Sequence, residues 1–144
     1  RAVYNVLCLV EDRNRRWGYD WRKDYDGRPI DEYFLSVAQG DFRRRRCVNF
    51  AVRRGEACIG EAVLYNPDWR GGMELGCRIA PEYAGHGYGR EAFAAAAEWA
   101  LYGLGLARVV AKCFKENEPS RRMLASCMRP SGEDETYFHF EKTV

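Results

Sequence analysis

Three glycines alternate with other residues at Gly85, Gly87 and Gly89, between a short apolar run and an alanine-rich segment. A glycine-rich backbone can turn its N–H groups toward an anion, and the positive end of a following helix dipole strengthens the attraction. The pattern therefore predicts a phosphate-bearing ligand held by main chain at this point. A simple tight turn is the alternative, although three alternating glycines exceed what a turn requires.

The segment from Gly87 to Ala92 also fits the dinucleotide-binding pattern G-x-G-x-x-A. Two observations count against that assignment. The strands before the glycines are predicted to form antiparallel hairpins, and the acidic residue expected about 20 positions later is absent. The chain also lacks a Gly-Lys-Ser/Thr sequence, which excludes a P-loop. A nucleotide-binding α/β protein remains an alternative.

Hydrophobic periodicity predicts the elements that position this loop. Helical spacing predicts a helix near residues 3–10 and a second helix that Asp31 caps and Gly40 ends. Alternation predicts strands at 48–52, 57–65 and 73–80, and the glycines then open a helix over 87–102. There follow a strand at 107–114, parallel to the strand before the glycines, a helix over 119–127, a loop at 129–134 and a strand at 136–140. The expected fold class is α/β (α+β), with a mostly antiparallel mixed sheet, one parallel pair and flanking helices, in a single domain over 1–144.

Composition indicates which partners and which cellular location to expect for this domain. The net charge of +2 is too small to argue for a nucleic-acid partner. Six cysteines without a Cys-x-x-Cys pair favour a reducing, cytoplasmic location, since a disulfide framework is not expected in a chain of this length. No apolar run approaches the roughly 18 residues that span a bilayer, so no membrane partner is expected. The chain begins at Arg1, which suggests that upstream residues are missing.

The run from Pro81 to Ala92 resembles the acetyl-CoA pyrophosphate loop of the GNAT N-acetyltransferases, written Arg/Gln-x-x-Gly-x-Gly/Ala. Two later segments, Leu104 to Val109 and Asn117 to Leu124, are similar to the "lgl-x-rv" and "N-x-x-S-x-x-x-L" segments of the RimJ/RimL-like branch. The resemblance covers about two thirds of the chain, with three segments in the expected order. It implies the GNAT fold, whose members normally supply one more strand before the first helix.

The resemblance implies acetyl-CoA as cosubstrate and no metal. Backbone groups of one strand end would pair with the pantetheine arm, and N–H groups of the glycine loop would hold the pyrophosphate. The residues expected to contact the cofactor are Arg78, Ile79, Ala80, Gly85, His86, Gly87, Tyr88, Gly89, Arg90, Asn117, Ser120 and Arg122. Two departures weaken the loop, because Ala84 replaces the usual Arg or Gln and His86, mostly neutral at pH 7, replaces the common lysine or arginine. Arg90 or Arg122 could restore the missing charge, or both could be ordinary solvated helix residues.

Acetyl transfer to an amine needs a base, because a primary amine is protonated at pH 7. Glu74 aligns with a glutamate that serves as base in some family members, and an ordinary strand-end carboxylate is the alternative. The tyrosine acid of many relatives falls at Leu124, so Ser120 is the expected substitute. Other candidate acids are Tyr102, Tyr137 and His139, and a covalent route through Cys127 is disfavoured because no histidine is placed to activate it.

The expected activity is transfer of acetyl from acetyl-CoA to a primary amine, a small amine or a protein N-terminus, by direct attack in a ternary complex. The alternative is a non-catalytic acyl-CoA-binding or regulatory module. Acidic residues that would attract a cationic acceptor, with a mobile polar loop as the alternative, are Asp20, Asp24, Asp26, Asp31 and Glu32. The basic run Arg43 to Arg46 is expected to be a solvated turn. The acceptor amine is the expected partner, and the sequence leaves a homodimer open.

Overall fold

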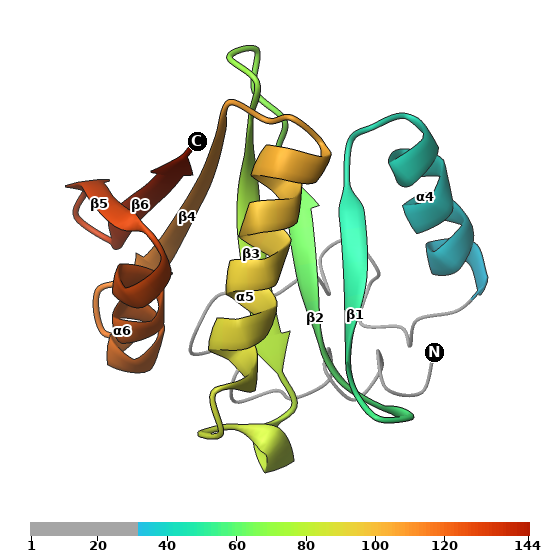
Figure 1. The fold of residues 1–144 in the computed structure, drawn as a ribbon, viewed down its shortest axis with the longest axis horizontal. Coiled ribbons are helices and arrows are strands. Elements are labelled where there is room, and N and C mark those ends of the chain that lie inside the picture. The colour runs from blue at the N-terminus through green and yellow to red at the C-terminus, as the bar shows by residue number, and fades with distance from the viewer. Residues whose placement is uncertain (1–31) are drawn as a thin grey trace.

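The computed structural model describes residues 32–144, which form one six-stranded sheet with helices against it (Figure 1). The predicted helix near residues 3–10 and the four aspartates proposed for the acceptor wall lie outside the described residues. The strands in chain order are β1 (Val48–Arg54), β2 (Ala57–Tyr65), β3 (Gly72–Ile79), β4 (Arg108–Phe114), β5 (Arg129–Glu133) and β6 (Tyr137–Thr143). The helices are α4 (Glu32–Arg43), α5 (Tyr88–Glu98) and α6 (Glu118–Cys127), and a π-helical turn, η2 (Trp99–Gly103), extends α5.

The sheet has the order β1-β2-β3-β4-β6-β5. All neighbouring strands are antiparallel except β3 and β4, which are parallel and joined through α5. This confirms the expected mixed sheet with one parallel pair and flanking helices. The parallel pairing covers only three residue pairs, from Gly72 with Arg108 to Glu74 with Val110. Beyond Glu74 the two strands diverge, as Figure 1 shows.

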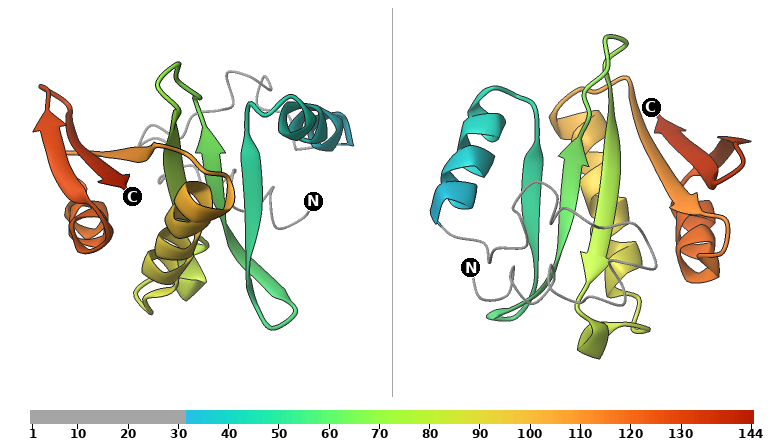
Figure 2. Two further views of the ribbon diagram at one scale, coloured as in Figure 1. Left: turned by 45° about the horizontal axis from the view of Figure 1, so that its top comes forward. Right: turned by 180° about the vertical axis from the view of Figure 1, so that it is seen from behind.

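The two faces of the sheet differ because side chains alternate along each strand. One face is apolar and packs against α5 and α6, which lie together on that side of the sheet (Figure 2). Its core includes Leu64, Leu75, Phe93 and Val109, each at most 2% exposed. The opposite face carries charged and polar side chains, among them Glu61, Tyr65, Glu74, Arg78 and Lys112 on adjacent strands. The polar face is therefore the side on which chemistry can take place.

One helix boundary and one loop differ from expectation. The helix predicted to end at Gly40 continues to Arg43. The Gly40 carbonyl still accepts a helical hydrogen bond, from the Arg44 N–H at 3.0 Å, and Gly40 does not adopt the left-handed conformation of a C-terminal cap. The predicted loop at 129–134 is wrong, since residues 129–133 form strand β5 against β6. The strand is exposed along its whole length and contains Pro130 and Gly132, so it carries no apolar alternation. An edge strand tolerates proline, because one side of its backbone has no ladder partner.

In residues 32–144, no helix has the length and apolar character needed to cross a membrane.

An ion pair ties the turn before β3 to the start of β4. Asp68 accepts the N–H groups of Arg70 and Gly72 at 2.7 and 2.9 Å, and its second oxygen accepts a hydrogen bond from Arg108 at 2.7 Å. The Arg108 hydrogen bond, with these backbone donors, lowers the pKa of Asp68 to about 2. The pair sits where β3 and β4 first meet, so it fixes the parallel pairing from which the two strands diverge.

We expect Asp68→Asn to destabilise the protein more at pH 5 than near pH 2.5. The folded pKa of Asp68 lies below its ordinary value of about 3.9. Its stabilising contribution is therefore present above about pH 4 and is lost as the pH falls toward 2. Both side chains are roughly one third exposed, so water screens the pair and the effect stays modest. Urea unfolding at the two pH values measures it, and an equal difference from wild type at both would contradict the assignment.

Candidate functional site

The glycine loop connects β3 to α5 through a short 3-10 turn at Pro81–Tyr83. Gly85 and Gly87 have φ angles of +78° and +82°, which side chains other than glycine rarely adopt. A Cβ atom built at either position meets no atom within 4 Å. Glycine is therefore needed at both positions for the backbone conformation and not for lack of space. Gly89 differs, because its Cβ would come within 3.4 Å of the Ile79 side chain, where α5 lies close against β3.

The loop presents a row of backbone donors. Ala84 N–H donates to the Pro81 carbonyl at 3.1 Å, and the next N–H with a backbone acceptor in residues 32–144 is that of Glu91, which bonds the Gly87 carbonyl at 3.1 Å. The six N–H groups of residues 85–90 between them have no backbone acceptor in this part of the chain. Because they stand at the N-terminus of α5, where the helix dipole is positive, this row can bind an anion.

Side chains beside the loop add aromatic surface and charge. His86 stacks on Tyr88 with ring centroids 5.7 Å apart, and its Nδ1 lies 3.3 Å from the Tyr83 carbonyl oxygen. The guanidinium of Arg54, at the tip of the β1–β2 hairpin, lies 5.6 Å from the centre of the Tyr88 ring. Arg90 is exposed in the first turn of α5. Arg54 escaped the sequence analysis, because nothing in a strand-end arginine indicates which loop it will approach.

A cavity of about 280 Å³ lies where β3 and β4 diverge. The described residues that line it are Tyr65, Glu74, Leu75, Gly76, Lys112, Cys113, Phe114, Asn117, Ser120 and Tyr137. Glu74 and Lys112 belong to the polar face of the sheet, whereas Asn117 and Ser120 begin α6, which lies on the apolar face. The cavity therefore connects the two sides of the sheet through the gap between the strands. It brings together both residues predicted to be catalytic, Glu74 and Ser120.

Glu74 is held by a network of three neighbours. Its Oε1 accepts a hydrogen bond from the Tyr65 hydroxyl at 2.8 Å, and its Oε2 accepts one from the Asn66 amide at 3.2 Å. The Lys112 ammonium lies 3.8 Å from Oε1. The side chain is 13% exposed, so the carboxylate is oriented but open to the cavity. The sequence placed Glu74 in a strand, but the register that brings Tyr65 opposite it and Lys112 beside it is visible only in the folded sheet.

Asn117 and Ser120 occupy the N-terminus of α6. The Asn117 side-chain oxygen accepts the Ser120 N–H at 3.2 Å, so Asn117 is the N-cap of the helix. Both residues line the cavity, so capping and ligand contact are compatible for Asn117. Arg122 is exposed one turn further on, with its Nε 3.8 Å from Glu118. This weak pairing leaves the Arg122 side chain in solvent.

The end of β3 and Ala80, predicted to bind pantetheine through their backbone, already form contacts within the protein. The Ala80 N–H donates to the Ile59 carbonyl at 2.7 Å, so at Ala80 only the carbonyl is available to a ligand. The Arg78 side chain pairs with Glu61, which is 5% exposed. Gly60 is required here, because a Cβ at that position would lie 2.3 Å from the Arg78 carbonyl oxygen. Arg78 therefore reaches toward β2 with its side chain, and its predicted cofactor contact concerns its backbone.

The candidates for a general acid differ in their positions. Leu124, at the position expected for the tyrosine acid of relatives, is 2% exposed in the core and has no proton to donate. Tyr137 lines the cavity, and the Lys112 ammonium lies 4.9 Å from its ring centre. His139 is bound to Asp134 at 2.7 Å, and Tyr102 is 68% exposed at the end of the π-helical turn. Of the three alternatives to Ser120, Tyr137 alone lies with it in the cavity.

The cysteines of the described part of the chain offer no nucleophile at this site. Cys113 lines the cavity, but burial raises the pKa of its thiol, which keeps it protonated. The Cys127 sulfur lies 3.5 Å from the Ser126 hydroxyl, and Cys127 is not among the described residues that line the cavity. The five cysteines of residues 32–144 are free thiols. In the same residues, no cluster of three or more His, Cys, Asp or Glu side chains could hold a metal ion.

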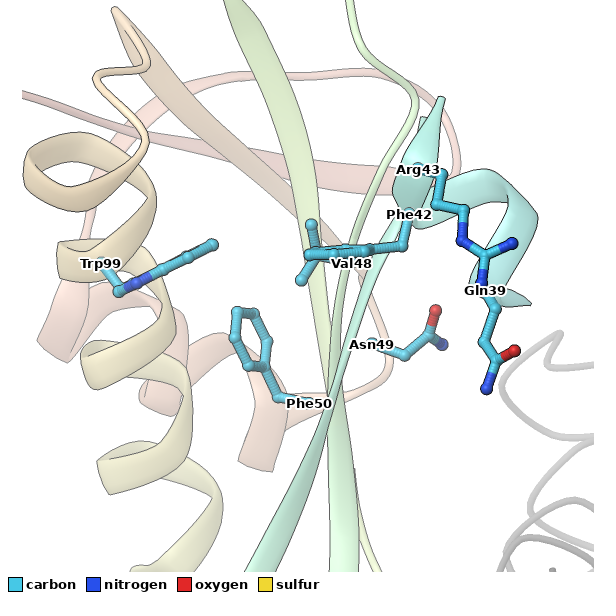
Figure 3. Close-up of a pocket in the computed structure, with 7 residues that line it drawn as sticks. All are labelled: Gln39, Phe42, Arg43, Val48, Asn49, Phe50 and Trp99. Atoms are coloured by element: carbon cyan, nitrogen blue, oxygen red, sulfur yellow. The ribbon is translucent and has the colours of Figure 1, made fainter. Parts of the chain in front are cut away.

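A second cavity, of about 560 Å³, lies between α4, β1 and the end of α5 (Figure 3). The described residues around it are Gln39, Phe42, Arg43, Val48, Asn49, Phe50 and Trp99. Figure 3 shows the aromatic rings of Phe42, Phe50 and Trp99 on the side of the strand that faces α5. Phe50 and Trp99 meet edge to face, with centroids 5.1 Å apart. The surface is mainly apolar and contains none of the predicted site residues, so we place the chemistry in the first cavity.

Comparison with known proteins supports a common ancestry for this arrangement. Residues 2–127 match the family model described as an acetyltransferase (GNAT) domain. The chain is 35% identical over 92 residues to the uncharacterized N-acetyltransferase YnaD of Bacillus subtilis (strain 168), covering 63% of this chain and 52% of that protein. The chain therefore spans about half the length of the curated relative that it matches.

Solved structures share the fold at lower identity. Mycobacterium smegmatis RimJ, in complex with CoA-disulfide, superimposes with a TM-score of 0.80 at 18% identity, over 99% of this chain and 77% of that one. A chimera of the spermidine N-acetyltransferase SpeG from Vibrio cholerae and hSSAT gives a TM-score of 0.69 at 16% identity, over 80% and 78% of the two chains. Because the family model matches residues 2–127, most of the sequence, this chain belongs to the GNAT acetyltransferase family.

Proposed function

We propose that the protein transfers an acetyl group from acetyl-CoA to a primary amine by direct attack in a ternary complex. One observation carries the proposal: a single cavity joins the polar face of β3 to the N-terminus of α6, where β3 and β4 diverge. An acetyl-CoA molecule bound along the gap between β3 and β4 would have the glycine loop at its pyrophosphate end and Glu74 at its thioester end. The likeness to RimJ over 99% of the chain supports placement in the RimJ-like branch.

Glu74 is the proposed base. Its carboxylate, oriented by Tyr65 and Asn66, takes a proton from the acceptor ammonium, directly or through water, and leaves a nucleophilic amine. The amine nitrogen attacks the thioester carbonyl, so a C–N bond forms and the C–S bond breaks. After the attack the nitrogen carries one excess proton, which passes through the Ser120 hydroxyl to the departing thiolate, so Ser120 relays a proton and ends neutral. Tyr137 is the second candidate in the cavity. The N–H groups of residues 85–90 would hold the pyrophosphate throughout.

A non-catalytic acyl-CoA-binding module is the second candidate. The specific observation in its favour is Leu124, a buried apolar side chain where many relatives have the tyrosine acid. Positioning alone supplies much of the rate in reactions of this kind, so the absence of that tyrosine does not by itself abolish turnover.

Release of CoA thiol from acetyl-CoA in the presence of a panel of amines separates the two functions. The panel should contain polyamines, aminoglycosides and peptides with free N-termini. The acetyltransferase predicts amine-dependent thiol release well above hydrolysis for at least one class. Binding of CoA with no amine-dependent release would favour the binding module.

A further inference from the structure

From Ala84 to Gly89 the glycine loop has no lysine or arginine, and Arg90, a predicted source of the missing charge, is exposed in the first turn of α5. Ala84 has no charged group, and His86 uses one ring nitrogen near the Tyr83 carbonyl and its ring face on Tyr88. CoA carries a pyrophosphate and a 3′-phosphate, so the backbone N–H groups and Arg90 would still face several negative charges. A cation close to the start of α5 would strengthen binding, since hydrogen bonds between ionised partners are about twice as strong as neutral ones.

The β1–β2 hairpin brings a cation to this place. Its tip and the glycine loop lie at the same end of the sheet (Figure 1), because β2 begins at Ala57, three residues before Gly60, and Gly60 pairs with Ile79 at the end of β3. The Arg54 guanidinium lies 5.6 Å from the centre of the Tyr88 ring, and Tyr88 is the first residue of α5. Arg54 is exposed, and no carboxylate in residues 32–144 forms an ion pair with it.

We propose that Arg54, held over the Tyr88 ring, binds a phosphate group of CoA and supplies the charge that Ala84 and His86 do not. This rests on the proposed function, because the phosphate ligand is the one that the glycine loop would hold. Tyr88 positions the guanidinium by a cation–π contact, while the N–H donors of residues 85–90 approach the ligand from the loop. The hairpin thus becomes part of the cofactor site.

Arg53 provides a matched control. It is the neighbouring arginine on the same exposed hairpin, and its guanidinium donates to the Glu56 carbonyl at 3.4 Å. Arg53→Ala removes the same charge from the same hairpin as Arg54→Ala. Long-range attraction between the hairpin and CoA would fall equally in both variants, whereas a direct contact belongs to Arg54 alone.

Calorimetric titration with CoA and with 3′-dephospho-CoA tests the proposal on wild type, Arg54→Ala, Arg54→Lys and Arg53→Ala. We expect Arg54→Ala to weaken CoA binding about tenfold, Arg54→Lys to recover part of the loss, and Arg53→Ala to bind within about twofold of wild type. A loss that persists with 3′-dephospho-CoA assigns Arg54 to the pyrophosphate. A loss that disappears assigns it to the 3′-phosphate.

Equal affinities of Arg54→Ala and Arg53→Ala for CoA would overturn the proposal. So would equal affinities of Arg54→Ala and wild type. Failure of wild-type protein to bind CoA at all would instead overturn the proposed function, so the two failures are distinguishable. Thermal unfolding of each variant without ligand separates a lost contact from a damaged fold.

Discussion

Glu74→Gln should lower kcat by about 10²- to 10⁴-fold while leaving CoA affinity unchanged, the usual range for loss of a general base. Glutamine has nearly the same shape and keeps one oxygen that can accept from Tyr65 or Asn66. The side chain would therefore stay in the cavity but could no longer take the proton. Steady-state kinetics with saturating acetyl-CoA and the best amine of the panel give kcat.

Glu135→Gln is the matched control for this substitution, because Glu135 is an exposed carboxylate in the turn before β6. We expect it to retain wild-type kcat. A pH profile adds a second readout, since the dependence of kcat/KM on the base should disappear in Glu74→Gln. Wild-type kcat in Glu74→Gln would show that the carboxylate only orders the start of β3 through Tyr65 and Asn66.

Gly87→Val should weaken CoA binding by at least about a hundredfold. Gly87 has a φ of +82°, where a β-branched side chain is strained, so the loop would have to change its backbone conformation. That change would alter the directions of the N–H groups of residues 85–90, which have no backbone acceptor in residues 32–144. Loss of two hydrogen bonds to a charged group, each worth roughly 1.5–3 kcal/mol, corresponds to a hundredfold or more in affinity.

Gly105→Val separates this effect from backbone strain. Gly105 has a φ of +74°, and a Cβ there meets no atom within 4 Å, as at Gly87, but it follows the π-helical turn at the far end of α5. Both variants should lose similar stability in urea unfolding, at roughly 1–2 kcal/mol for the strained backbone. Only Gly87→Val should lose CoA affinity. Equal CoA affinities for the two variants would contradict a role for the loop in binding.

The sequence was most informative where local chemistry decides the structure. Alternating glycines before an alanine-rich run predict a glycine loop at a helix start, and α5 begins directly after Gly85 and Gly87, whose φ angles are positive. Asn117 followed by Pro119 predicts a capped helix, and the cap is observed. The parallel pairing of β3 and β4 follows from the helix between them. The fold class could therefore be predicted from the sequence.

The missed features depend on contacts between distant parts of the chain. Strand β5 is exposed and contains Pro130 and Gly132, so only its pairing with β6 makes it a strand. In the sequence, nothing distinguishes Lys112 from any other polar strand residue. It approaches Glu74 because β3 and β4 lie side by side. Arg54 meets Tyr88 because the β1–β2 hairpin tip and the glycine loop lie at the same end of the sheet. The roles of the predicted site residues remain predictions. Three of those residues, Glu74, Asn117 and Ser120, line one cavity, which is the structural basis for testing them.

Thermal unfolding with CoA and with NAD tests most directly whether the glycine loop is a CoA site. A ligand present at about 100 times its Kd stabilises the folded state by roughly 2.7 kcal/mol, which raises Tm by several degrees in a domain of this size. We predict that rise with CoA and none with NAD at the same concentration. Protection by NAD without protection by CoA would contradict the account.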